Sequence, residues 1–213
     1  VGVWYAVLVG AIGGIIVGLV TEYYTGGAPV RKIAKDGETG PATVMISGLA
    51  IGMQSVAIPV LTIAAIIFFA NLSAGLYGVG MAAVGMLATV GITMAIDAYG
   101  PVADNAGGIA EMAEMGPETR EITDSLDEVG NSTAAIGKGF AISAAALAAL
   151  ALISAYIVKV SNGDPDFVLA INDPIVLVGM FIGGIFPFLV SSITMTAVGD
   201  AAFEMIIEVR RQF

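Results

Sequence analysis

Neither cysteine nor histidine occurs anywhere in the 213-residue sequence. Disulfides, thiolate nucleophiles, imidazole bases and zinc sites built from these residues are therefore excluded, and any bound metal ion must be held by oxygen atoms. Charge is also scarce, since 12% of the residues are charged against roughly 25% in average soluble domains. Eight basic and eighteen acidic residues give a net charge of −10, so the chain lacks the basic surface that nucleic-acid binding requires.

Long stretches of the chain carry no charge at all. They are residues 1–21, 39–96, 139–158 and 174–199, and a membrane-spanning helix needs about 20 apolar residues. The second stretch is long enough for two spans, with a turn at Asn71–Gly75. Because strict alternation is absent, helices are favoured over barrel strands. We predict an all-α integral membrane protein with five transmembrane helices, at about residues 1–23, 42–70, 75–104, 125–158 and 173–203.

The basic residues predict the orientation of these helices. With five alternating spans, seven of the eight fall on one side, and only Lys159 falls on the other. The seven are Arg31, Lys32, Lys35, Arg120, Lys138, Arg210 and Arg211. Because Lys and Arg are enriched in cytoplasmic loops, this side is predicted to be cytoplasmic.

Two carboxylates fall within the third predicted helix. Asp97 and Asp104 are two helical turns apart and share one face. Pro101 cannot donate a hydrogen bond to the carbonyl of Asp97, and it is expected to kink the helix. An ionisable residue inside a membrane helix marks a functional site by default. The spot can coordinate a cation, or it can simply be hydrated at the membrane interface.

The fourth predicted helix carries a polar stripe at helical spacing, with Thr123 or Ser125 as the expected cap of its first turn. The stripe consists of Asp124, Asp127, Asn131, Ala134 and Lys138. Its acids can also be explained as a solvated first turn that the helix dipole favours. Because helices three and four are antiparallel, Asp104 is expected to face the stripe across a cavity open to the cytoplasm. Carboxylate and amide oxygens are ligands suited to Mg²⁺ and to its phosphate-bearing partners.

These residues also carry a family resemblance. The runs Asp97–Met112 and Thr123–Ile142 closely resemble the membrane-integral, ion-pumping pyrophosphatases, and the likeness extends to Val20–Thr25 and Val209–Phe213. The resemblance implies a homodimer in the lipid bilayer. Each family member has about sixteen membrane helices, which form an inner and an outer ring. This chain resembles the ninth to the thirteenth helix. Because it begins at Val1 inside an apolar run, we expect an internal piece of a longer protein.

The resemblance also implies roles for individual residues at a site that binds pyrophosphate as its magnesium complex. Asp104 would be a magnesium ligand, and Asn131 would support the same cluster. Ala134 and Gly137 stand where potassium-independent members have lysine and threonine, which implies dependence on K⁺. Lys138 would be a charge partner of the carboxylates. From its depth in the helix we infer that Asp97 lies on the ion path or serves packing.

The expected function is magnesium-dependent hydrolysis of pyrophosphate, coupled to outward pumping of Na⁺ or H⁺ and stimulated by K⁺. The expected location is the inner membrane of a bacterial cell. The aspartates that activate water in the family have no counterpart here, so no catalytic residue is assigned and the piece alone should be inactive. The competing interpretation is a non-enzymatic cation transporter or channel subunit, in which the same carboxylates bind only the transported ion.

Overall fold

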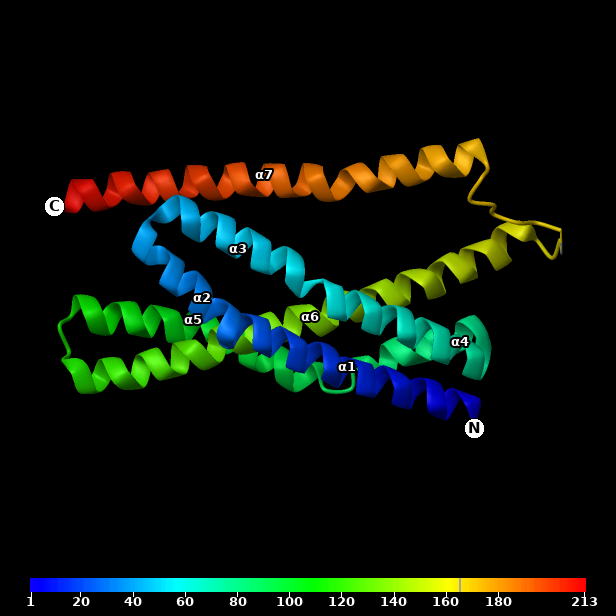
Figure 1. The fold of residues 1–213 in the computed structure, drawn as a ribbon, viewed down its shortest axis with the longest axis horizontal. Coiled ribbons are helices and arrows are strands. Elements are labelled where there is room, and N and C mark those ends of the chain that lie inside the picture. The colour runs from blue at the N-terminus through cyan, green and yellow to red at the C-terminus, as the bar shows by residue number, and fades with distance from the viewer. Residues whose placement is uncertain (165) are drawn as a thin grey trace. The chain divides into compact units, whose positions relative to one another are not determined.

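The computed structural model describes residues 1–164 and 166–213, which form two compact units, Val1–Tyr156 and Ile157–Phe213. Helices make up nearly all of this described part, which contains no strand. In chain order they are α1 (Gly2–Gly26), α2 (Ala28–Asp36), the 3₁₀ helix η1 (Gly37–Thr39), α3 (Pro41–Ser55), α4 (Ala57–Met86), α5 (Val90–Met112), α6 (Pro117–Ser161) and α7 (Pro174–Gln212). The predicted all-α fold class is confirmed (Figure 1).

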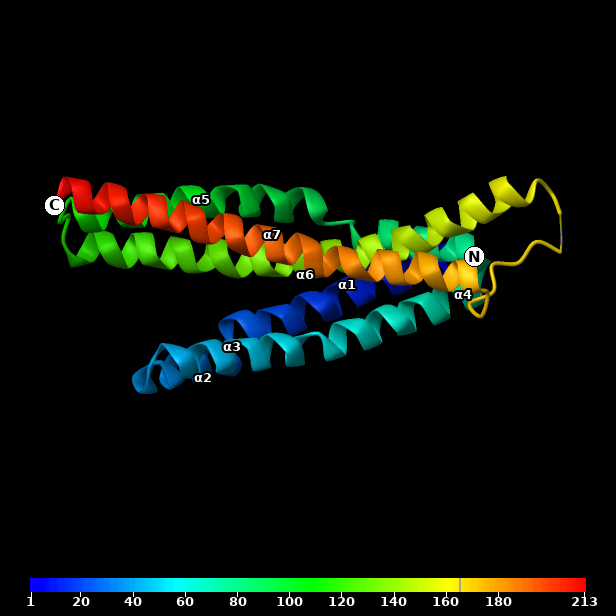
Figure 2. The same ribbon diagram turned by 90° about the horizontal axis from the view of Figure 1, so that it is seen from above.

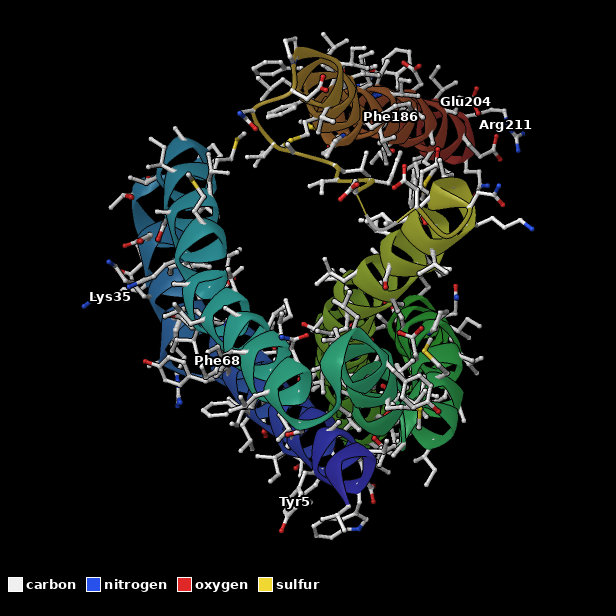
Figure 3. The ribbon with its side chains drawn as sticks, turned by 90° about the vertical axis from the view of Figure 1, so that its right-hand side faces the viewer. Tyr5, Lys35, Phe68, Phe186, Glu204 and Arg211 are labelled. Carbon is white, nitrogen blue, oxygen red and sulfur yellow. The ribbon has the colours of Figure 1, made fainter. Side chains whose placement is uncertain are left out.

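Four helical segments in the described residues are long and apolar enough to cross a membrane. They are Gly2–Thr39, Pro41–Met86, Pro117–Ser161 and Pro174–Gln212. Large apolar side chains also cover the outside of the first unit, as Tyr5 on α1 illustrates with half of its surface exposed (Figure 3). Such a surface is suited to lipid or to neighbouring membrane helices. The chain is a multi-pass integral membrane protein.

The chain reverses its direction within α4, at the turn that the sequence predicts. Ala74 and Gly75 leave helical geometry, with φ −154° and ψ 27° for Ala74 and φ 62° and ψ −159° for Gly75. This conformation of Gly75 is one that only glycine adopts without strain. The segment Pro41–Met86 therefore contains both the second predicted helix and the beginning of the third (Figure 1).

Replacing Gly75 by alanine should destabilise the protein. A Cβ atom at this φ and ψ meets no neighbour, so the cost is conformational, about 1–3 kcal/mol. Gly48→Ala is the matched control, because Gly48 is helical and a Cβ there also meets nothing. Thermal unfolding of the detergent-solubilised full-length protein should show a lower midpoint for Gly75→Ala only. An unchanged midpoint would mean that the turn has another conformation.

The third predicted helix, residues 75–104, is not continuous in the structure. The chain leaves the helix at Leu87–Thr89 and starts again as α5, which continues beyond residue 104 to Met112. In this break Ala88 N donates to Gly85 O at 3.2 Å, and Val90 N donates to Leu87 O at 3.0 Å. These hydrogen bonds join residues three apart, as in a 3₁₀ helix, and they pair backbone groups that would otherwise lack a partner at the break. Because neither glycine nor proline stands at residues 87–89, the sequence offers no signal for this interruption.

The predicted start of the fourth helix is also wrong. α6 begins at Pro117, after Gly116 with φ 89°, and not at residue 125. The hydroxyl of Thr123 donates to the carbonyls of Thr119 and Arg120 inside the helix, so it caps nothing. Proline is favoured in the first turn, where its missing N–H needs no partner. The acidic stretch is therefore helical from its beginning.

The core of the first unit lies between α1, α4 and α6. Val17, Val79 and Leu147, one from each helix, are fully buried there. Small residues bring the helices close, and Gly10 packs against the carbonyl of Ala82. α5 continues from α4 away from the turn at Gly75, and the first half of α6 returns along it, so that the two form a hairpin (Figure 2). The core thus fixes α6, on which most of the predicted site residues lie.

The second unit consists mainly of α7. Its first turn is capped by Asp173, whose Oδ1 accepts a hydrogen bond from Ile175 N at 2.8 Å. Near its end the guanidinium of Arg211 pairs with both carboxylate oxygens of Glu208, at 2.8 and 2.6 Å. α7 runs from Pro174 to Gln212, beyond the predicted end at residue 203, and none of its residues is buried.

Candidate functional site

The hairpin of α5 and α6 is tightly packed at two glycines. A Cβ atom on Gly130 would lie 2.8 Å from the Cα of Gly100, so the two backbones are in direct contact. One residue before Gly100, the hydroxyl of Tyr99 donates to the carbonyl of Leu126 at 2.8 Å. The loop between the helices contains Glu114 with φ 52° and Gly116 with φ 89°. The two helices are therefore antiparallel and close together, as the sequence predicts.

A cavity of about 330 Å³ lies beside this contact. It is lined by Asp97, Gly100, Pro101 and Asp104 from α5 and by Gly130, Asn131, Ala134 and Lys138 from α6. Five of the six residues that received an individual role in the sequence analysis thus line one cavity, which we call the α5–α6 cavity. Gly137 does not line it; this glycine is buried, and its Cβ position lies 3.1 Å from Cγ2 of Thr93.

Asn131 is oriented by its neighbour one turn earlier on α6. Its Nδ2 donates to Oδ2 of Asp127 at 3.1 Å, which leaves the amide oxygen free as an acceptor. Asn131 also lines a second cavity, of about 600 Å³, together with Asp124, Asp127 and Glu128 of α6 and Arg31 of α2. It stands on the wall of both cavities, and the carboxylate of Asp127 holds its side chain.

One oxygen atom of this cluster has no hydrogen-bond partner in the described residues. Oδ1 of Asp127 is buried and unpaired, although a buried acceptor without a partner is costly. The donor set around it consists of carboxylate and amide oxygens, which fit a hard cation such as Mg²⁺. The described residues contain no group of three acids close enough to hold a metal ion. The hairpin therefore fits as one part of a metal site whose other ligands come from elsewhere.

The charged groups of the α5–α6 cavity are two acids and one base. Asp97 is half-buried, whereas Asp104 and Lys138 are exposed. No carboxylate lies within ion-pair distance of Lys138 in the described part of the chain, so the charge partner expected for Lys138 stays a prediction. α5 continues through Pro101, and since proline has no N–H, the carbonyl of Asp97 lacks its usual helical donor. Its oxygen adds a further acceptor close to the Asp97 carboxylate.

Sequence reasoning missed two contacts that hold the hairpin together. One is the hydrogen bond of Tyr99 to the backbone of α6, and the other is a set of three contacts made by Arg120, described below. Neither has a periodic signal, because each depends on which residues of α5 and α6 stand opposite each other. The only hint for Arg120 was its position as the one base among eight acids in residues 104–128.

Comparison with known proteins identifies the family. The family model described as "Inorganic H+ pyrophosphatase" matches residues 1–213, the whole of the chain. The chain belongs to this family. The hairpin with Asp104 and Asn131 is therefore part of a member of this family, as the resemblance of the sequence implied.

Three relatives are similar over almost the whole chain. A protein of Clostridium tetani named "Putative K(+)-stimulated pyrophosphate-energized sodium pump" is 54% identical over 99% of the chain. A Bacteroides thetaiotaomicron protein of the same name is 48% identical over 98%. A Methanosarcina mazei protein named "K(+)-insensitive pyrophosphate-energized proton pump" is 46% identical over 99%. The matched region makes up 32%, 34% and 32% of these proteins, so the chain spans about a third of their length.

Proposed function

We propose that the full-length protein is an ion-translocating inorganic pyrophosphatase. It hydrolyses pyrophosphate to two phosphates with the help of Mg²⁺ and couples this reaction to outward pumping of Na⁺ or H⁺. The observation that carries the proposal is the α5–α6 cavity, which Asp97 and Asp104 of α5 line together with Asn131 and Lys138 of α6. Membership of the family and the names of the relatives support it.

The residues of the hairpin have different roles in binding. Asp104 supplies an anionic oxygen ligand near the loop end of α5, and Asn131 supplies a neutral one that Asp127 orients. Bound Mg²⁺ would neutralise phosphate charge and polarise the reacting phosphoryl group. Lys138 presents an ammonium group in the same cavity, suited to a phosphate oxygen or to a carboxylate. Residues outside this chain position the attacking water, so the chain alone is inactive.

The direction of transport follows from the orientation proposed above. α2 and the loop between α5 and α6 lie at the same end of the first unit, opposite Val1 and the turn at Gly75 (Figure 1). Lys35 projects outward from α2 (Figure 3), and Arg120 follows the loop, so basic residues gather at this end, as cytoplasmic loops require. The substrate then enters from the cytoplasm. Asp97 lies two turns farther from the loop than Asp104, where we place the beginning of the ion path.

The test of the function is pyrophosphate-driven transport. Inside-out membrane vesicles that contain the full-length protein should release phosphate from pyrophosphate in the presence of Mg²⁺ and accumulate Na⁺ or H⁺ at the same time. An ionophore that dissipates the ion gradient should leave phosphate release intact. Ion movement without any phosphate release would instead support the transporter or channel. Na⁺ uptake is expected first, because the relatives at 54% and 48% identity are named sodium pumps.

The residue at position 134 is proposed to make the enzyme dependent on K⁺. Ala134 lines the α5–α6 cavity with Asp97 and Asp104, where a lysine ammonium can replace a bound K⁺ as a fixed cation. Gly137 acts indirectly, since it sets the packing of α6 against Thr93 of α5.

Ala134→Lys in the full-length protein should therefore remove the stimulation by K⁺. Phosphate release from pyrophosphate is measured with and without added K⁺ at constant ionic strength. Ala134→Met is the matched control, because methionine is similarly long but uncharged, and it should keep the response to K⁺. Persistent stimulation of Ala134→Lys by K⁺ would contradict the assignment.

A further inference from the structure

We propose that Arg120 is the positioning residue of the magnesium site. It ties the end of α5 to the beginning of α6 and thereby fixes the place of Asp104. This inference rests on the proposed function, since it names a residue that prepares the same site. Arg120 itself does not line the α5–α6 cavity, so it acts through the backbone that carries Asp104.

The contacts of Arg120 join two helices through three acceptors. Nη1 donates to the carbonyl of Gly107 at 2.8 Å and lies 3.1 Å from Oε2 of Glu111, both on α5. Nη2 lies 3.1 Å from Oδ1 of Asp124, one turn later on α6. The Arg120 side chain is 32% exposed, against 72% for Glu111. The Arg120 side chain is thus partly buried between the two helices.

The backbone contact is what links Arg120 to the site. Gly107 follows Asp104 by one helical turn, so a donor fixed on its carbonyl fixes the turn that carries Asp104. Gly107 is buried, and its Cβ position lies 4.0 Å from Oδ1 of Asp124 and 4.0 Å from Oγ1 of Thr123. On the other side of Asp104, Tyr99 bonds to Leu126. Asp104 therefore lies between two hydrogen-bonded contacts of α5 with α6, and the contact made by Arg120 is the one nearer the loop.

Arginine is suited to this role where lysine is not. Its guanidinium presents five N–H donors in a rigid, planar fork, whereas an ammonium group is a compact point charge on a flexible stem. Three acceptors on two helices require such a fork. Arg120 is also the one base among the eight acids of residues 104–128, so it reduces the repulsion that would drive the acidic ends of the two helices apart. We therefore expect Arg120→Lys to rescue the site only in part.

The experiment measures the affinity for Mg²⁺ in two ways on the full-length protein. One readout is the Mg²⁺ concentration for half-maximal hydrolysis of pyrophosphate. The other needs no turnover: the rise of the thermal unfolding midpoint as Mg²⁺ is added, which reports binding to the folded state. Changes in residues that orient metal ligands typically cost 10- to 100-fold in metal affinity or activity. Both readouts for Arg120→Ala should shift to about tenfold higher Mg²⁺, with Arg120→Lys between it and the wild type.

The controls separate positioning from other effects. Lys35→Ala removes one charge from α2, which lies at the same end of the first unit as the loop between α5 and α6 (Figure 1), and should leave both readouts unchanged. If Arg120→Ala does not fold, the double variant Glu111→Gln with Asp124→Asn removes both carboxylate partners and should shift the Mg²⁺ requirement in the same direction. A purely structural role would lower the unfolding midpoint without Mg²⁺ but leave the Mg²⁺ requirement at its wild-type value, and this result would overturn the inference. Absence of pyrophosphate hydrolysis in the wild type would instead refute the proposed function.

Discussion

Asp104→Asn should abolish magnesium-dependent pyrophosphate hydrolysis by the full-length protein. The substitution keeps the shape of the side chain but removes the negative charge that the α5–α6 cavity presents near the loop end of α5. Charge stabilisation through a bound metal ion contributes several kcal/mol to such reactions, and 1.4 kcal/mol corresponds to a factor of ten. We therefore expect a loss of about a hundredfold or more, measured as phosphate release.

The control for this variant is another acid of the same hairpin. Glu121 is exposed on α6 and lines neither the α5–α6 cavity nor the neighbouring cavity of Asn131. Glu121→Gln removes the same charge at a solvated position and should keep near wild-type activity. If Asp104→Asn hydrolyses pyrophosphate as well as Glu121→Gln does, Asp104 is not a ligand of the site.

Gly130→Ala should damage the candidate site although it removes no functional group. Its Cβ would lie 2.8 Å from the Cα of Gly100, and because the obstacle is backbone, the helices themselves must move apart. Overpacking of this kind typically costs 1–3 kcal/mol. The shift separates Asp104 on α5 from Asn131 on α6, and misplacement by about 1 Å can cost a hundredfold in rate. We expect a loss of activity of about 10- to 100-fold.

Gly108→Ala provides the comparison. Gly108 lies in α5 within the same hairpin, but a Cβ there meets no atom within 4 Å. Alanine in place of a helical glycine stabilises by roughly 0.5–1 kcal/mol, so this variant should remain active and unfold at the same or a higher temperature. Equal activities of Gly130→Ala and Gly108→Ala would show that the close contact of the helices does not position the site.

The sequence alone predicted which residues line one cavity, because this information is periodic. Asp97 and Asp104 recur at helical spacing, and so do Asp127, Asn131, Ala134 and Lys138, so their faces follow once the helices are recognised. The structure brings five of the six residues with an individual role to one cavity. The hydrogen bond between Asn131 and Asp127 also joins neighbours on one helix face, and its spacing is readable from the sequence.

What the sequence could not predict depends on helix ends and on register. The break at Leu87–Thr89 has no glycine or proline to mark it, and the capping signal at Thr123 was misleading because Gly116 and Pro117 already start α6. The hydrogen bonds of Tyr99 and Arg120 between the two helices can be predicted only if it is known which turn of α5 lies opposite which turn of α6. This register is set by the contact of Gly100 with Gly130. The sequence does not indicate which glycine of one helix packs against which glycine of the other.

The most direct test of the central claim is a structure of the full-length protein with Mg²⁺ and a pyrophosphate analogue that cannot be hydrolysed. Our account predicts a Mg²⁺ ion bridging the analogue and an Asp104 carboxylate oxygen, at the metal–oxygen distance of about 2.0–2.1 Å. It also predicts the side chain of Asn131 beside the same cluster. An analogue and its Mg²⁺ ions bound elsewhere, with Asp104 and Asn131 facing only solvent or lipid, would contradict the account.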